Sequence, residues 1–117
     1  MSSQDYLNQA SAMLRRAALA RKQEADELRH QLDEKERERH DILNKKERER
    51  IIHLERAARS DSDAERGEMF SRAQLLANEK SKIDKEYNLQ KRKLDEELNN
   101  IQRSVDNINN MASSLGG

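Results

Sequence analysis

The chain contains neither cysteine nor proline, and it is poor in aromatic residues. Without cysteine there are no disulfides and no thiolate metal sites, and without proline no residue is obliged to break a helix. Only three of the 117 residues are aromatic, namely Tyr6, Phe70 and Tyr87. These are few of the large anchors that a compact core uses. We therefore expect a fold that needs only a narrow apolar interface.

The sequence also lacks a net charge and any long apolar run. Its 23 basic side chains balance its 23 acidic ones, so it has no basic excess of the kind that nucleic-acid binding draws on. No apolar run approaches the roughly 20 residues of a membrane span, and no signal-peptide core is visible. We expect a cytoplasmic protein that has no nucleic-acid partner and makes no membrane contact.

What the sequence does contain is helix-forming and charged. Charged residues make up 39% of the chain and hydrophobic residues 33%, against the roughly 45–50% apolar content of ordinary domains. Ordering each residue costs roughly 1–2 kcal/mol, so a chain with little apolar surface to bury tends to stay disordered. Two long helices that share one apolar stripe avoid this outcome. The composition therefore predicts an all-α coiled coil.

The second half of the chain carries a regular apolar stripe. Its positions alternate steps of four and three residues, which is the spacing of a coiled-coil seam. The predicted seam positions are Met69, Ala73, Leu76, Lys80, Ile83, Tyr87, Gln90, Leu94, Leu98, Ile101, Val105, Ile108, Ala112 and Leu115. The step from Leu94 to Leu98 is four residues where three are due, which predicts a stutter. Lys80 and Gln90 are candidates for fixing register and oligomeric state; equally, a thin seam leaves enough water to tolerate them.

The first half carries a weaker stripe. Its predicted seam positions are Leu7, Ala10, Leu14, Ala17, Arg21, Ala25, Leu28, Leu32, Lys35, Arg39 and Ile42, with a stutter between Arg21 and Ala25. Residues 33–50 are almost wholly charged, and pairs of opposite charge one turn apart keep such a stretch helical. We expect this stretch to lack a good seam partner within the chain. It would then be a stiff spacer or a surface that another protein covers.

The only interior cluster of turn and cap residues lies at 60–67. Ser60 with Asp63, or Ser62 with Glu65, has the spacing of a helix-starting cap. We predict a single coiled-coil domain over 1–117, with helix 1 at 4–59, a turn and cap region at 60–67 and helix 2 at 62–115. Folding at about residue 61 gives an antiparallel hairpin in which Ala10 lies opposite Ala112. The alternative is one near-continuous helix in a parallel dimer.

No motif for catalysis, cofactor binding or metal binding emerges. Glu27 and His30 have the Glu-x-x-His spacing of di-iron bundles, but those sites need a second copy of the motif. There is no glycine-rich phosphate loop. We expect no enzyme activity, no cofactor and no metal. The expected role is a structural or adaptor coiled coil that mediates assembly with protein partners, with copies of itself, or with both.

Two resemblances suggest an alternative role. The stripe around Gln90 resembles a SNARE-type helix with a central glutamine, although Lys80 and the layer spacing depart from that pattern. Two long charged helices of equal length are also similar to the stalk proteins of secretion systems. We infer membership of neither family. The resemblances imply, as the alternative function, a tether or an accessory protein in secretion or trafficking.

Overall fold

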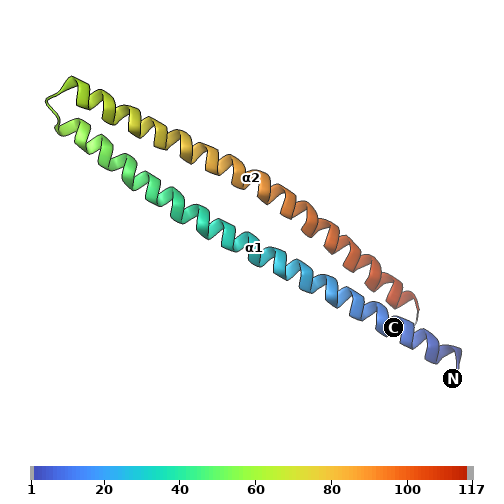
Figure 1. Cartoon of the computed structure of the whole chain (residues 1–117). Helices are drawn as coiled ribbons and strands as arrows, with labels where there is room; N and C mark the ends of the chain where they lie inside the picture. Colours follow the sequence, from blue (N-terminus) through green and yellow to red (C-terminus); the bar gives the residue numbers. More distant parts are fainter. Residues whose placement is uncertain (1, 116–117) are drawn as a thin grey trace. The chain divides into compact units, whose positions relative to one another are not determined.

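The structure, a computed structural model, describes residues 2–115. Met1, Gly116 and Gly117 of the predicted domain lie outside the described residues. Two α-helices, α1 (Ser3–Arg59) and α2 (Asp63–Ser114), account for nearly all of the described chain. Residues 60–62 join them (Figure 1). No strand occurs between residues 2 and 115.

The two helices pack against each other in antiparallel directions, as an α-helical hairpin (Figure 1). This confirms the predicted fold class, and the alternative of one near-continuous helix is wrong. The helix limits differ by one residue from the predicted 4–59 and 62–115. Such long helices form because the sequence consists mainly of strong helix formers and contains no proline.

The turn between the helices is closed by local hydrogen bonds. The Glu65 amide donates to Ser62 Oγ at 3.2 Å, which makes Ser62 the N-cap of α2. The Ser62 amide donates to Ser60 Oγ at 3.1 Å. The Arg66 guanidinium donates to the Ser60 carbonyl at 2.7 Å, which satisfies a carbonyl that follows the end of α1. An N-cap side chain of this type contributes about 1 kcal/mol.

The start of α1 has a reciprocal cap of its own. The Asp5 amide donates to Ser2 Oγ at 3.2 Å, and the Ser2 amide donates to Asp5 Oδ2 at 3.0 Å. Two backbone N–H groups near the helix start are therefore satisfied by side chains. This cap explains why the helix begins at Ser3 and not at residue 4.

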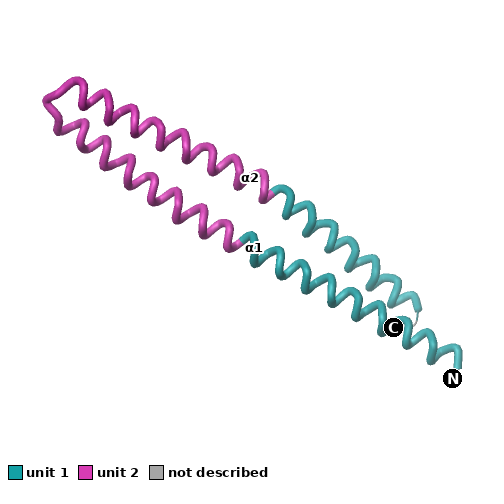
Figure 2. The backbone as a smooth tube through the Cα atoms, viewed as in Figure 1, with its two compact units in different colours: residues 1–32, 92–117 teal, residues 33–91 magenta. Residues whose placement is uncertain are grey.

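The chain divides into two compact units (Figure 2). Unit 1 comprises Met1–Leu32 and Arg92–Gly117, and unit 2 comprises Asp33–Lys91. In each unit a segment of α1 packs against a segment of α2. The buried apolar residues of unit 1 are Ala18, Ala25, Ile101, Val105 and Ala112, and those of unit 2 are Ala57, Met69, Ala73 and Leu76.

Candidate assembly surface

Small and branched side chains form the interhelical seam of unit 1. Ala18 and Ala25 on α1 form one cluster with Ile101 and Val105 on α2. Leu28, Leu98 and Ile108 pack against this cluster. Val105 is 1% exposed and is the largest fully buried side chain among the described residues. Alanine on one helix opposite branched residues on the other lets the helices approach closely.

A buried hydroxyl ties the two helices of unit 1 together. Ser11 is buried, and its Oγ donates to the Ala112 carbonyl at 3.0 Å. The Ala112 carbonyl also accepts from the Leu115 amide at 3.2 Å, so α1 supplies a second donor near the end of α2, where carbonyls lack the usual helical partner. We predicted Ala10 opposite Ala112, whereas the direct contact is made by Ser11. A serine among apolar positions was the available signal, and the apolar pattern alone passed over it.

The predicted stripe of α1 needs a correction in its first half. Ala17 is exposed and Ala18 is buried, so the assignment of Ala17 to the seam is wrong. Leu7 is also classed as exposed. The covered positions from Ser11 to Leu32 alternate steps of three and four without interruption: Ser11, Leu14, Ala18, Arg21, Ala25, Leu28 and Leu32. The stutter predicted between Arg21 and Ala25 is therefore absent.

Farther along α1, the stripe shifts by one residue at another point. Ile42, predicted for the seam, is exposed, and the neighbouring Leu43 is partly covered. Lys35 and Arg39 are both partly covered. A step of four from Lys35 to Arg39 followed by a step of four to Leu43 places the irregularity of α1 within unit 2.

The predicted stripe of α2 corresponds closely to the covered positions. Met69, Ala73, Leu76, Ile101, Val105 and Ala112 are buried, and Lys80, Ile83, Tyr87, Leu94, Leu98, Ile108 and Leu115 are partly covered. Gln90 is exposed. The covered positions include both Leu94 and Leu98, in keeping with the predicted four-residue step. The proposed role of Lys80 and Gln90 in setting register stays a prediction.

In unit 2 the charged stretch of α1 finds partners on α2. Arg39 contacts Asp84 at 2.7 Å, and Lys46 contacts Glu79 at 2.8 Å. Lys80 contacts Glu47 at 2.5 Å. These ion pairs overturn the prediction that residues 33–50 lack a partner within the chain. The signal was present in the sequence, because the charges that face each other in the hairpin have opposite signs.

Arg39 makes polar contacts with side chains of both helices in unit 2. Its guanidinium contacts Glu36 at 2.5 Å and Asp84, and it lies 4.4 Å from the centroid of the Tyr87 ring. Hydrogen bonds from Arg39 and from Tyr87 lower the pKa of Glu36. The hydrogen bonds to Glu36 and Asp84 raise the pKa of Arg39. The arginine thus joins two acidic side chains and an aromatic face across the helices of unit 2.

Glu47 forms a second polar centre in unit 2. It accepts a hydrogen bond from Arg50, at 2.6 Å for the shortest contact, and one from Lys80 at 2.5 Å. The hydrogen bond from Arg50, followed by that from Lys80, lowers the pKa of Glu47 to about 2. Glu47 is therefore ionised at neutral pH, and its contacts with Arg50 and Lys80 join opposite charges.

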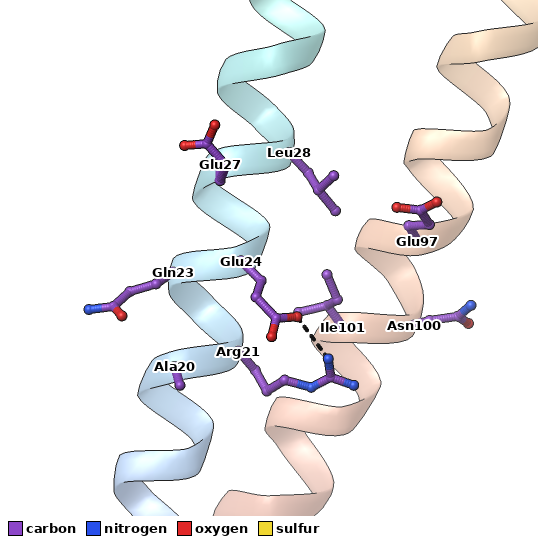
Figure 3. Close-up of a pocket in the computed structure, with 9 residues that line it drawn as sticks. All are labelled: Ala20, Arg21, Gln23, Glu24, Glu27, Leu28, Glu97, Asn100 and Ile101. Atoms are coloured by element: carbon purple, nitrogen blue, oxygen red, sulfur yellow. Dashed lines mark hydrogen bonds and ion pairs between the residues drawn. The ribbon is translucent and has the colours of Figure 1, made fainter.

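Unit 1 also has an open groove between its helices (Figure 3). The groove has a volume of about 710 Å³. Leu28 and Ile101 point toward each other between the helices in Figure 3, whereas Gln23 and Asn100 point away from the groove. Arg21 contacts Glu24 at 2.8 Å, and Glu97 lies across from them on α2. Apolar side chains at the base and charged ones at the rim suit contact with another polypeptide.

A second apolar stripe on α1 lies beside the seam; four of its five members are exposed, and Ala10 is partly covered. Its members alternate steps of four and three residues, so they share one face of the helix. We call it the outer stripe; it consists of Tyr6, Ala10, Met13, Ala17 and Ala20. Tyr6 is 60% exposed and Met13 is 68% exposed. The predicted seam includes Ala10 and Ala17, so the stripe is not among the sequence predictions.

Between residues 2 and 115, no group of three or more histidine, aspartate or glutamate side chains is placed to hold a metal ion. Glu27, which has the Glu-x-x-His spacing with His30, lines the groove of unit 1. Over the same residues, neither helix is long and apolar enough to cross a membrane.

Comparison of the chain with known protein families, curated proteins and solved structures gave no match.

Proposed function

We propose that this chain is a structural or adaptor coiled coil that mediates protein–protein assembly in the cytoplasm and carries out no catalysis. The observation that carries the proposal is the outer stripe of unit 1. The stripe presents two large exposed apolar side chains and two exposed alanines, with the partly covered Ala10, on a face beside the hairpin seam. Contiguous exposed apolar surface on a protein commonly marks a site of protein–protein contact.

The contacts between the helices support this role, because in both units they are made mainly by residues that do not belong to the outer stripe. The seam of unit 1 is filled by its own cluster of apolar residues. The polar seam of unit 2 is matched by its own ion pairs. In coiled coils, flanking charges select the partner and the orientation. A hairpin with a completed seam and one further apolar stripe has the pattern of an assembly module.

The test is affinity capture of the tagged chain from its own cells, with mass spectrometry and two matched variants. Met13→Glu places a charge in the outer stripe. Leu19→Glu makes the same chemical change at a 56% exposed residue on another face of α1. We expect the wild-type chain and Leu19→Glu to recover the same set of proteins, or the untagged chain itself, and Met13→Glu to lose it. Equal recovery by all three chains would contradict the proposal, provided that circular dichroism shows equal helix content.

A second candidate function, as a tether or an accessory in secretion or trafficking, has one observation in its favour. Arg15 and Arg16 lie on the same span of α1 as the outer stripe. Apolar residues with neighbouring arginines on one helix are typical of segments that lie in a membrane interface. Flotation with anionic and neutral lipid vesicles tests this function. Binding to anionic vesicles that Met13→Glu abolishes would favour the tether over the adaptor.

A further inference from the structure

We propose that the outer stripe of unit 1 binds the outer stripe of a second copy of this chain, with the two α1 helices antiparallel. The inference rests on the proposed assembly function and names the occupant of its surface. It makes the stripe a two-fold interface, in which the same residues of both copies meet.

The order of side-chain sizes along the stripe is the first argument. Large and small residues alternate from Tyr6 to Ala17. When a second stripe runs in the opposite direction, Tyr6 lies opposite Ala17 of the other copy and Ala10 lies opposite Met13. By symmetry the same two pairings recur in reverse, which gives four layers. Each layer contains one large side chain and one alanine, and pairing of large with small side chains is the arrangement that fills an interface without voids.

The other orientations of the stripe fit less well. A parallel pair would place Tyr6 against Tyr6 and Met13 against Met13, with three alanine layers that leave the helices in poor contact. An antiparallel pair shifted by seven residues would bring Tyr6 against Glu24. The four-layer antiparallel register therefore has the best steric match, and it buries no carboxylate.

The residues beside the stripe are compatible with the same register. On one side, Leu7 and Leu14 of the two copies come into proximity, which extends the apolar contact. On the other side, Arg16 comes near Gln9 of the other copy, so no like charges face each other. Like-charge contacts across a helix interface are the usual device against a wrong partner, and their absence here fits self-association.

A methionine of α2 adds to this surface. Met111 precedes Ala112, which accepts the hydrogen bond from Ser11 of α1, so Met111 lies near the level of Ala10 and Met13 in the outer stripe. Met111 is 52% exposed. Met111 directly precedes the seam residue Ala112, as Ala10 directly precedes the seam residue Ser11. In an antiparallel pair of helices, residues at these matching positions border the same side of the seam. A second copy seated on the outer stripe would therefore cover Met111 as well.

Sedimentation equilibrium of the full chain tests the oligomeric state. We expect a monomer–dimer equilibrium for the wild type and for Leu19→Glu. Met13→Glu should raise the dissociation constant roughly tenfold or more, because each dimer would bury two unpaired carboxylates. A wild type that stays monomeric, or a Met13→Glu chain that dimerises as well as the wild type, would overturn the proposal.

Cysteine cross-linking tests the register. The chain contains no cysteine of its own, so only the introduced thiols can form a disulfide. A mixture of Tyr6→Cys and Ala17→Cys chains should form a disulfide-linked pair under mild oxidation, because these positions share a layer. Tyr6→Cys alone should not cross-link. In the antiparallel register its two sulfurs are separated by eleven residues, or roughly 16 Å along the helix, whereas a disulfide requires Cα atoms within about 7 Å. Cross-linking of Tyr6→Cys to itself would show a parallel pair and overturn the proposal.

The two proposals fail in different ways. A monomeric wild type whose Met13-dependent capture recovers a different protein would overturn the self-association and leave the assembly function standing. A chain that neither dimerises nor recovers any protein through the outer stripe would overturn both.

Discussion

The seam of unit 1 and the charged part of the seam of unit 2 use the same residue spacing with opposite chemistry. In unit 1 the seam positions are occupied by Ala18, Ala25, Ile101 and Val105, which form one apolar cluster. In the charged part of unit 2, corresponding positions carry residues such as Arg39 and contribute ion pairs and a cation–π contact. The comparison teaches that the three–four spacing places side chains between two helices whether or not they are apolar.

The two kinds of seam differ in what they contribute. Burial of apolar surface contributes roughly 25 cal/mol per Å², and close packing makes it sensitive to the loss of single methyl groups. Partly exposed ion pairs contribute about 0–1 kcal/mol each and weaken with added salt. Their directionality, however, sets which residues face each other. We infer that the apolar parts of the seam, in unit 1 and around Met69 to Leu76 in unit 2, supply most of its stability per residue, and that the ion pairs of unit 2 favour one register.

Truncation of Val105 should produce the largest effect on this comparison. Val105→Ala removes two methyl groups from the most completely buried large side chain of unit 1. We expect the free energy of unfolding to fall by about 2 kcal/mol, from lost burial and a residual cavity. Urea denaturation followed by circular dichroism measures it. A loss that changes strongly with salt concentration would contradict the apolar account of this seam.

A substitution at Arg39 should have a smaller effect and one that depends on salt. Arg39→Met keeps much of the side-chain length but removes the contacts with Glu36 and Asp84. We expect a loss of about 1 kcal/mol at low ionic strength. Urea denaturation in about 0.5 M NaCl should reduce that loss, because the Debye length shortens to a few ångströms. The Val105→Ala loss serves as the control, and equal salt dependence of the two variants would remove the distinction between the seams.

The smallest expected effect concerns pH and Glu47. Its pKa is lowered from 4.5 to about 2, chiefly by Arg50. A carboxylate with a lowered pKa in the folded state contributes stability that is complete above its unfolded pKa, here 4.5, and that is lost as the pH falls toward 2. The difference in melting temperature between the wild type and Glu47→Gln should therefore be constant above about pH 5 and shrink below it. A difference that does not change between pH 5 and pH 2 would show that the pairs with Arg50 and Lys80 add nothing.

Much of the fold follows from local sequence signals. The absence of proline and the abundance of helix formers require long helices, and the cap spacing of Ser62 and Glu65 marks where the second helix starts. The seam of α2 was readable because twelve of its fourteen predicted positions are apolar, although the exposed Phe70, Leu75 and Met111 stand directly beside seam residues. Leu94 and Leu98, one turn apart, are both partly covered.

The seam of α1 was harder to read for a physical reason. Ala17 and Ala18 are adjacent and equally small, so an apolar pattern passes through either one. If Ala17 is assigned to the seam, the pattern needs a stutter between Arg21 and Ala25. The same assignment passes over Ser11 and counts residues of the outer stripe as seam residues. Cross-helix charges were likewise invisible to a search for apolar residues alone. Only the partner helix decides such positions, since Lys46 and Glu47 become seam residues by facing Glu79 and Lys80.

The turn has a practical consequence for anyone who handles this protein. Its side-chain hydrogen bonds join Ser60, Ser62, Glu65 and Arg66 to one another. Asp61, at the middle of the connection, is exposed and lies outside both helices. Short exposed connections of this kind are where proteins best accept inserted peptides. An epitope or a fluorophore acceptor inserted after Asp61 would label the chain while leaving both ends, the seam and the outer stripe of α1 unaltered in sequence.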